Sequence, residues 1–153
     1  MKTSKLDFMR ENFTDDFALE LERLLLLHMD ELCMFEEAVL SPHWEMYRKL
    51  QEHGGLRVFT ARADGELVGY AVYFIGPHHH YTNIMVATQD VLFLDPEYRV
   101  GRNGILLILF SENMMKQDGV DRVLQHTKKQ KDLTRLLDRL GYEHCDSIMM
   151  KRI

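Results

Sequence analysis

The stretch LDPEYRVGRNGILLILF, residues 94 to 110, decides the fold because it is predicted to join a strand to a helix. An apolar run ends at Leu94, Asp95-Pro96 interrupts it, and a second apolar run starts at Ile105. The turn between these runs contains Arg99, Gly101, Arg102 and Gly104. A strand that enters a tight turn and then a helix directs several backbone N–H groups and the positive end of the helix dipole at one point. The stretch therefore predicts an anion site, and its glycines and arginines suit a diphosphate better than a single carboxylate.

Two common diphosphate motifs do not match this turn. A P-loop requires Lys and then Ser or Thr after its last glycine, whereas Ile105 and Leu106 follow Gly104 here. A dinucleotide fingerprint requires three glycines in the first strand-helix-strand unit of a doubly wound domain, and this turn comes about two-thirds of the way along the chain. The diphosphate ligand must therefore belong to another class.

Length and composition favour a single domain over residues 1–153, with 46% hydrophobic and 28% charged residues. The 19 Lys and Arg residues against 24 Asp and Glu residues give a charge of −5, which argues against a nucleic-acid partner. No apolar run approaches the roughly 20 residues of a membrane span, and the N-terminal stretch lacks the continuous apolar core of a signal peptide, so we expect a soluble protein without a membrane partner. Cys33 and Cys145 lack metal-ligand or redox spacing, which favours free thiols and a cytoplasmic location.

Two helices are predicted before any strand. Apolar residues recur at helical spacing from Phe17 to His28, within a helix expected over residues 14–34. Ser41 as N-cap and Pro42 as first helical residue begin the second helix, which Gly54-Gly55 ends.

Three antiparallel strands are expected next. Residues 56 to 76 form two strands around Asp64-Gly65, a dipeptide that tolerates the positive φ angles of a tight hairpin turn. Gly76-Pro77 is expected to end the second strand, and the third spans about residues 84 to 94. The sequence thus predicts an antiparallel meander.

The pattern then alternates between helices and strands. We expect a helix over residues 103 to 117, a strand over 120 to 127, a helix from an N-cap at Asp132 to Gly141, and a last strand near 147 to 152. Such crossovers make parallel strand pairs. The predicted fold class is α/β with a mixed sheet: two N-terminal helices, an antiparallel meander, and then parallel strand-helix-strand units.

Residues 94 to 105 resemble the acetyl-coenzyme A (acetyl-CoA) pyrophosphate loop of the GCN5-related N-acetyltransferase (GNAT) family. Residues 138 to 153 are similar to that family's closing helix, its Gly-aromatic pair and its last strand, so the resemblance extends over nearly the whole chain. The family loop has a glycine where Arg102 stands here, with Gly101 one place earlier, and a variant of this kind is known in the family. Short members of this type occur in bacteria and tailed phages.

The resemblance implies a set of cofactor-binding residues. The backbone N–H groups that would hold the pyrophosphate belong to Val100, Gly101, Arg102, Asn103, Gly104 and Ile105, with Arg99 beside them. The strand at Leu92, Phe93 and Leu94 would pair its backbone with the pantetheine arm. Lys128 is either a further contact to the phosphates or part of a solvated run of lysines.

The chemistry of acetyl transfer to an amine requires a base, an oxyanion donor and a proton for the departing thiolate. Asp90, an acidic residue within an apolar strand, is our candidate base; the alternative is that it forms a local pair or positions substrate. In the family, a tyrosine often donates the proton to the thiolate. Leu137 stands at the corresponding position here and has no proton to donate, so the proton source is water, Tyr81 or His126. Tyr142 is interpreted as packing.

The three histidines at 78 to 80 are not interpreted as a metal site, because adjacent residues of an extended chain point in alternating directions. They are either part of the acceptor rim or an exposed loop. The function that the sequence implies is acetyl transfer from acetyl-CoA, as cosubstrate and without a metal, to an amine of a small molecule or protein. The alternatives are an inactive binding module of the same fold and transfer of another acyl group. A homodimer is compatible with the resemblance.

Overall fold

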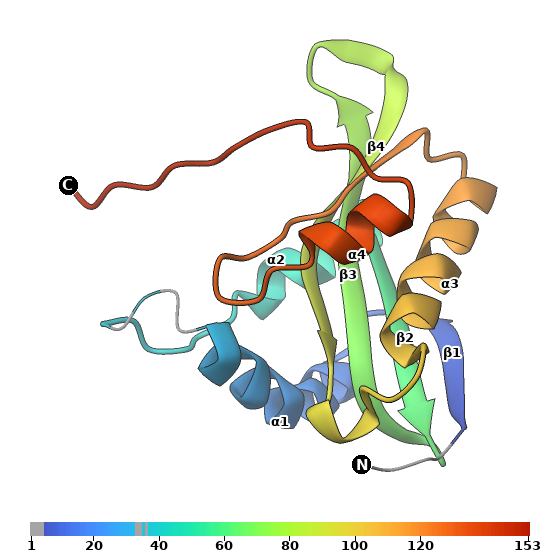
Figure 1. Cartoon of the computed structure of the whole chain (residues 1–153), viewed down its shortest axis with the longest axis vertical. Helices are drawn as coiled ribbons and strands as arrows, with labels where there is room; N and C mark the ends of the chain where they lie inside the picture. Colours follow the sequence, from blue (N-terminus) through green and yellow to red (C-terminus); the bar gives the residue numbers. More distant parts are fainter. Residues whose placement is uncertain (1–4, 33–34, 36) are drawn as a thin grey trace.

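A five-stranded mixed sheet forms the centre of the computed structural model, which describes residues 5–32, 35 and 37–153 (Figure 1). The strands are β1 (Leu6–Glu11), β2 (Leu56–Ala63), β3 (Glu66–His78), β4 (Tyr81–Leu94) and β5 (Arg122–Leu124), in that order across the sheet. The helices are α1 (Asp15–Leu32), α2 (Trp44–Glu52), the short 3-10 helix η1 (Pro96–Tyr98), α3 (Asn103–Gln117) and α4 (Thr134–Arg139). The predicted α/β class with a mixed sheet is confirmed, and no helix among the described residues could cross a membrane.

The antiparallel meander is confirmed. β2, β3 and β4 pair in antiparallel succession, and the turn between β2 and β3 has φ angles of 49° at Asp64 and 85° at Gly65. Positive φ at both central residues gives the turn a twist that matches the twist of the strands. The helix predicted over residues 103 to 117 is confirmed with the same bounds, and the crossover through α3 makes β4 and β5 parallel.

The prediction that helices come first is wrong, because β1 precedes them and pairs with β2 at the sheet edge. In the sequence of β1 only Leu6 and Phe8 are apolar residues that face the core, which is too few for a clear alternation of apolar and polar residues. The prediction that Gly76-Pro77 ends β3 is also wrong, since the strand continues to His78. β2 pairs with β3 only as far as Phe74, so the missing N–H of Pro77 costs no ladder hydrogen bond there.

Several predicted boundaries shift in the C-terminal half and around α2. Helix α2 begins at Trp44, two residues after the predicted start, and α4 covers only part of the predicted helix. The strand predicted near 147 to 152 does not form, and residues 143 to 153 extend away from α4 (Figure 1). The expected continuation of α1 to Met34 lies outside the described residues, as does Cys33, whereas Cys145 is a free, exposed thiol.

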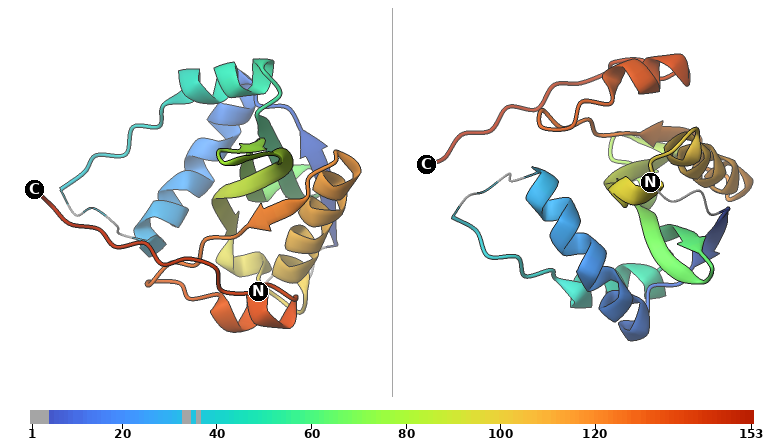
Figure 2. Two further views of the ribbon diagram at one scale, coloured as in Figure 1. Left: turned by 90° about the horizontal axis from the view of Figure 1, so that it is seen from above. Right: turned by 60° about the horizontal axis from the view of Figure 1, so that its bottom comes forward.

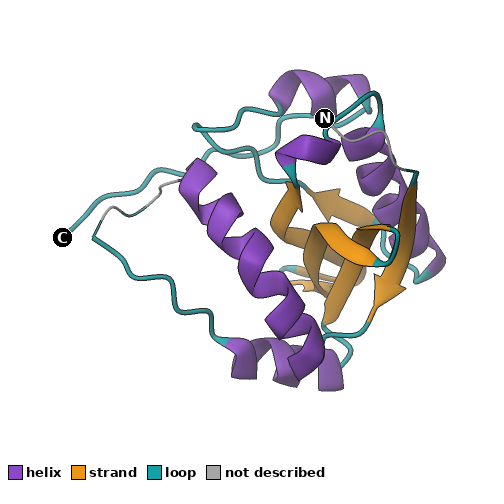
Figure 3. Cartoon of the chain, turned by 90° about the horizontal axis from the view of Figure 1, so that it is seen from below, coloured by secondary structure: helices purple, strands orange, loops and turns teal. Residues whose placement is uncertain are grey.

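Helices cover both faces of the sheet (Figure 2). α1 runs obliquely across one face (Figure 3), where its buried residues, among them Phe17, Leu21 and Leu24, pack with Val58 and Tyr70 of the sheet. α3 packs against the opposite face. β2 and β3 are therefore buried on both sides, as continuous apolar strands require.

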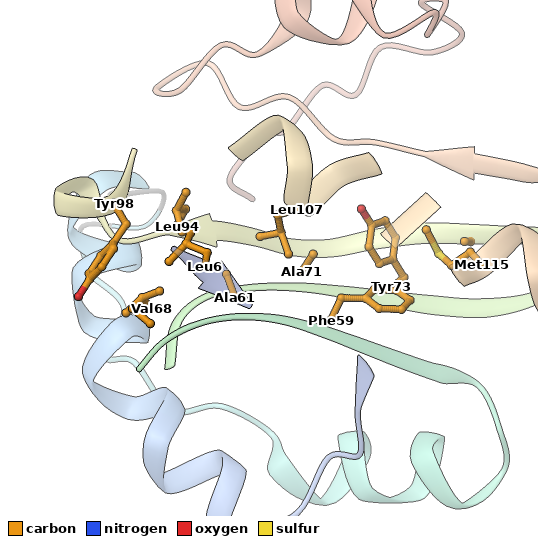
Figure 4. Packing of buried hydrophobic residues seen from close by; sticks show 12 residues of the cluster. Leu6, Phe59, Ala61, Val68, Ala71, Tyr73, Leu94, Tyr98, Leu107 and Met115 are labelled. Carbon is orange, nitrogen blue, oxygen red and sulfur yellow. The ribbon is translucent and has the colours of Figure 1, made fainter. Parts of the chain in front are cut away.

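The α3 face of the sheet is built from small residues. Ala61, Ala71 and Ala87 are completely buried beneath the helix, and Leu107 packs above Ala71 (Figure 4). Side chains as short as alanine allow a helix to approach a sheet closely. This approach brings the N-terminus of α3 to the end of β4.

The break after Leu94 is made by Asp95 and Pro96. The Asp95 carboxylate accepts a hydrogen bond of 3.0 Å from the Glu97 N–H, and Pro96 occupies the first position of η1. The Asp95 N–H donates to the Val68 carbonyl at 2.8 Å, which holds the turn against β3. The position of the glycine turn is therefore fixed relative to the sheet.

β3 and β4 pack closely at Gly69, near this turn. A Cβ at Gly69 would lie 2.7 Å from Leu94 Cδ1 and 3.0 Å from the Phe93 carbonyl oxygen, whereas a Cβ at Gly76 in the same strand would meet nothing within 4 Å. We expect Gly69→Ala to lower the free energy of unfolding by about 1–3 kcal/mol, because overpacking forces a backbone shift. Urea denaturation measures this, with Gly76→Ala as the matched control. Equal stability of the two variants would contradict the close packing of Gly69 on β4.

Candidate functional site

β4 and β5 separate halfway along β4. They pair through Val86–Arg122, Ala87–Val123 and Thr88–Leu124, and no strand of the described chain covers the same edge of β4 from Gln89 to Leu94. At the point of separation the Gln89 side-chain carbonyl accepts a hydrogen bond of 2.8 Å from the His126 N–H. The Gln89 side chain, which the sequence interpretation missed, therefore holds the two chain segments together where the ladder stops.

A cavity of about 440 Å³ lies along this edge. Its volume is within the range of about 300–1,000 Å³ that small-molecule sites occupy. The predicted site residues that line the cavity are Asp90, Leu92, Phe93, Leu94, Arg99, Gly101, Gly104, Ile105, His126 and Lys128. The fold thus brings together residues from the end of β4, the glycine turn, α3 and the segment after β5.

Four predicted site residues do not line the cavity. Val100, Arg102 and Asn103 lie in the glycine turn or at the start of α3 without reaching it. Tyr81 lies at the opposite end of β4 from the turn, is 63% exposed, and contacts His78 with its ring. The histidine loop is the exposed tip of the β3–β4 hairpin, so neither it nor Tyr81 contributes to this cavity.

The N-terminus of α3 closes one end of the cavity. The first helical bond runs from the Leu106 N–H to the Arg102 carbonyl at 2.8 Å, so the N–H groups of Gly104 and Ile105 precede the helical bonding pattern. Gly101 has a φ of +57°, and a Cβ at Gly104 would meet nothing within 4 Å. The backbone is therefore open to an anion at the positive end of the helix dipole.

Arg99 forms contacts that the sequence did not predict. Its Nε donates to the Leu94 carbonyl at 2.6 Å, its guanidinium pairs with Glu31 of α1 at 2.7 Å, and it lies 5.2 Å from the centre of the Phe93 ring. Glu31 also lies 3.8 Å from Lys131. Arg99 therefore connects the glycine turn to α1 and shares a carboxylate instead of presenting an unpaired charge.

Asp90 occupies a β-bulge. Val72 pairs with Val91 and Tyr73 pairs with Gln89, which leaves Asp90 as the extra residue of β4. A bulge redirects a side chain, and bulges are frequent beside active sites.

Tyr47 of α2 contacts this carboxylate. The Tyr47 hydroxyl donates a hydrogen bond of 2.5 Å to Asp90 Oδ2, and its ring packs with Trp44. Burial raises the pKa of Asp90 above its usual value, against the opposing effects of the Tyr47 hydrogen bond and the nearby Lys128 and His126 side chains. Asp90 is thus a partly buried carboxylate with one oxygen held and with increased basicity.

His28 is a cavity-lining residue whose role the sequence did not reveal. It occupies an apolar position of α1, is 5% exposed, and stacks on Phe93 with ring centres 4.8 Å apart. Its Nδ1 lies 2.9 Å from the hydroxyl of Tyr70. Burial lowers the pKa of His28 to about 4, with Glu31 opposing this shift and Arg99 and Lys128 adding to it. The only signal in the sequence is a polar residue within an otherwise apolar helix face.

Tyrosines near α4 do not reach the cavity. The Tyr142 hydroxyl donates to Glu112 at 2.5 Å and accepts from Gln125 at 3.2 Å, in a half-buried cluster under α3. Leu137 is buried in the protein. Among the residues that the structure describes, no tyrosine lines the cavity, and no three His, Cys, Asp or Glu side chains form a metal-binding group.

The buried imidazole makes stability depend on pH. The pKa of His28 is about 4 in the folded protein and 6.5 as its ordinary value, so the unfolded chain takes up a proton first as the pH falls. The contribution of neutral His28 is complete above about pH 6.5 and is lost toward pH 4. We expect the drop in the free energy of unfolding between pH 7.5 and 4.5 to be smaller in His28→Gln by about 2–3 kcal/mol.

Urea denaturation at the two pH values measures this difference. The matched control is His53→Gln, which replaces an exposed imidazole at the end of α2. Identical pH dependence in wild type and His28→Gln would mean that His28 is not buried as a neutral group.

Comparisons with known proteins identify the family of this chain. Residues 21–142 match the sequence model of the Acetyltransferase (GNAT) family. No curated protein matches the sequence significantly.

Several solved acetyltransferases share the fold. An aminoglycoside acetyltransferase from an uncultured soil metagenomic sample has a TM-score of 0.74 at 16% identity, with 97% of this chain and 96% of that chain covered. The ribosomal-protein-alanine N-acetyltransferase of Brucella melitensis biovar Abortus 2308 has a TM-score of 0.71 at 17% identity, covering 97% and 99%. A predicted acetyltransferase of Clostridium acetobutylicum, solved with acetyl-CoA, has a TM-score of 0.71 at 10% identity, covering 97% and 96%. Since the family model spans most of the chain, this protein belongs to the GNAT acetyltransferase family.

Proposed function

We propose that this protein transfers an acetyl group from acetyl-CoA directly to a primary amine of a small molecule or protein. The observation that carries the proposal is the cavity along the uncovered edge of β4, which reaches both the N-terminus of α3 at Gly104 and the carboxylate of Asp90. A thioester that carries a diphosphate needs an anion site, and an amine that must lose a proton needs a base. One cavity supplies both.

The residues around the cavity fit coenzyme A. The open backbone at Gly101 and Gly104 suits a pyrophosphate, because a phosphate can approach N–H groups that no Cβ shields. The uncovered edge of β4 between Gln89 and Leu94 has outward-facing backbone N–H and carbonyl groups for the amides of the pantetheine arm, apart from the Leu94 carbonyl, which accepts from Arg99 Nε. Lys128 lines the cavity and forms no ion pair within the described chain, so it remains available to a phosphate.

Asp90 would accept the proton of the incoming ammonium group. The neutral amine nitrogen then attacks the thioester carbonyl carbon, a C–N bond forms, and the C–S bond breaks to release the thiolate. A backbone N–H of β4 beside the bulge would stabilise the oxyanion. The attacking nitrogen loses its second proton as the amide forms, and water or His126 would pass this proton to the thiolate, since Leu137 replaces the family tyrosine and Tyr81 lies outside the cavity.

Either a small molecule or a protein can be the amine acceptor. The structural relatives include an aminoglycoside acetyltransferase and a ribosomal-protein-alanine N-acetyltransferase, so the same fold accommodates both kinds of acceptor. The aromatic rings of Phe13, Trp44 and Tyr47 pack together, with 5.4 Å between the ring centres of Phe13 and Tyr47, and the Tyr47 hydroxyl contacts Asp90. This cluster supports the Asp90 carboxylate from α2 and does not itself line the cavity.

Gly104→Asp tests the cofactor site. An aspartate in the first turn of α3 interacts favourably with the helix dipole, and its Cβ would meet nothing within 4 Å, so the fold should remain at least as stable. Its charge would repel a pyrophosphate, and we expect acetyl-CoA affinity to fall by at least about 100-fold, corresponding to nearly 3 kcal/mol. Isothermal titration calorimetry with acetyl-CoA measures this effect.

Gly76→Asp is the matched control, because Gly76 is also free of close contacts but lies in β3 outside the cavity. It should bind acetyl-CoA as wild type does. If Gly104→Asp binds acetyl-CoA with wild-type affinity, the pyrophosphate does not bind at the N-terminus of α3. If the wild-type protein does not bind acetyl-CoA, acetyl-CoA is not its substrate.

Asp90→Asn tests the base once a screen of amines has identified an acceptor. We expect kcat to fall by about 10²–10⁴-fold with acetyl-CoA affinity little changed, the usual contribution of a general base. Tyr47→Phe keeps the carboxylate but removes the hydrogen bond that lowers the pKa of Asp90, so the acid limb of kcat/KM should move to higher pH. Rates and pH profiles equal to wild type in both variants would assign the base to another group.

A further inference from the structure

The buried pair His28 and Tyr70 is not used by the acetyl transfer proposed above. Tyr70 is a β3 residue that is completely buried, and its hydroxyl lies 2.9 Å from Nδ1 of His28. His28 comes from α1, so the pair joins the sheet to the helix beside the cavity. Both residues lie on the α1 face, with the Phe93 ring stacked on the imidazole.

The hydrogen bond with Tyr70 determines which imidazole nitrogen of His28 carries the proton. Burial raises the pKa of the Tyr70 hydroxyl, so it remains protonated, and His28 is its hydrogen-bond partner among the described residues. A buried hydroxyl that keeps its proton must donate it, since an unsatisfied buried donor is costly. Nδ1 of His28 is therefore the acceptor, and the neutral ring carries its proton on Nε2.

The Nε2–H group is the His28 donor that remains for a ligand. Nε2 has no hydrogen-bond partner among the described residues. In the described residues, the one fully buried side-chain nitrogen or oxygen without a partner is Gln125 Oε1. Nε2 of His28 is therefore not fully buried. His28 lines the cavity, so the accessible part of its ring faces that space. The protein thus presents a neutral hydrogen-bond donor beside the apolar side chains of Met29, Leu32 and Phe93. Charged groups line the same cavity: Glu31 and Arg99, which pair with each other, and Lys128.

The chemistry of this donor restricts its ligand. An ammonium group has no lone pair to accept a hydrogen bond, and a pyrophosphate has its own site at the N-terminus of α3. A neutral donor beside apolar side chains suits a neutral acceptor such as a carbonyl oxygen. Acetyl-CoA carries carbonyl oxygens in its thioester and in the amides of its pantetheine arm.

We propose that His28 binds acyl-CoA directly, its Nε2–H donating a hydrogen bond to a carbonyl oxygen of the ligand, and that Tyr70 is the positioning residue that fixes the required tautomer. This inference rests on the proposed function, because it assumes that the cavity binds coenzyme A. It adds a side-chain donor from α1 to a site otherwise built from β4 and the glycine turn. It also explains why a polar residue interrupts the apolar face of α1.

NMR of the protein labelled with ¹⁵N in its histidine rings tests the tautomer without any ligand. His28→Gln assigns the signal by its disappearance. We expect a neutral ring with the proton on Nε2 at pH 7, and a changed Nδ1 shift in Tyr70→Phe, which removes the hydrogen bond. A proton on Nδ1, or a charged ring at pH 7, would overturn the proposal.

Acetyl-CoA and free CoA are then added to the same labelled sample, with binding measured in parallel by calorimetry. A change in the Nε2 signal with acetyl-CoA alone supports a bond to the thioester carbonyl, and a change with both ligands supports a bond to a pantetheine amide. Binding of both ligands without any change at Nε2 overturns this inference but leaves the proposed function intact. No binding of either ligand overturns both.

The double variant His28→Phe/Tyr70→Phe measures the effect on affinity. It keeps a ring stacked on Phe93 and leaves no unsatisfied hydroxyl, so the fold should be retained. We expect about a 5- to 10-fold loss of affinity for the ligand whose carbonyl is bound, as for one neutral hydrogen bond. His53→Phe is the control, since His53 is exposed on α2 and does not line the cavity. Wild-type affinity in the double variant would contradict the proposal.

Discussion

The separation of β4 from β5 after Thr88 is the constraint on which the rest of this structure depends. β4 extends to Leu94, but β5 ends at Leu124 after three paired residues, and the described chain provides no other strand for that edge. Backbone N–H and carbonyl groups that lose a protein partner must bond to water or a ligand. The cavity lies beside these groups because the sheet ends there.

Other interactions hold the walls of the cavity in place. Gln89 bonds to the His126 backbone where the ladder stops, and Arg99 connects the glycine turn to Glu31 of α1. The bulge at Asp90 allows its carboxylate to meet Tyr47 from α2. Each contact joins segments that are far apart in the sequence, so the cavity has walls from both faces of the sheet.

Local sequence signals accounted for much of the fold, and they failed where tertiary packing decides. The Asp64-Gly65 hairpin and helix α3 were predicted correctly because turn chemistry and helical periodicity are local. Strand β1 was missed because an edge strand needs few apolar residues, and residues 147 to 152, which were expected to form a strand, pair with no strand of the sheet. At the site, most predicted residues line one cavity, whereas Tyr81 lies at the far end of β4.

The sequence by itself determined the order of most elements, the glycine turn between β4 and α3, and the position of an acidic residue in an apolar strand. These features depend on backbone φ preferences, helix-end geometry and side-chain periodicity, which act over a few residues. Only the tertiary structure decided that Arg99 pairs with Glu31, that Tyr47 holds Asp90, and that His28 meets Tyr70. Such pairs join residues more than 40 positions apart along the chain, and the packing of α1 and α2 on the sheet creates them.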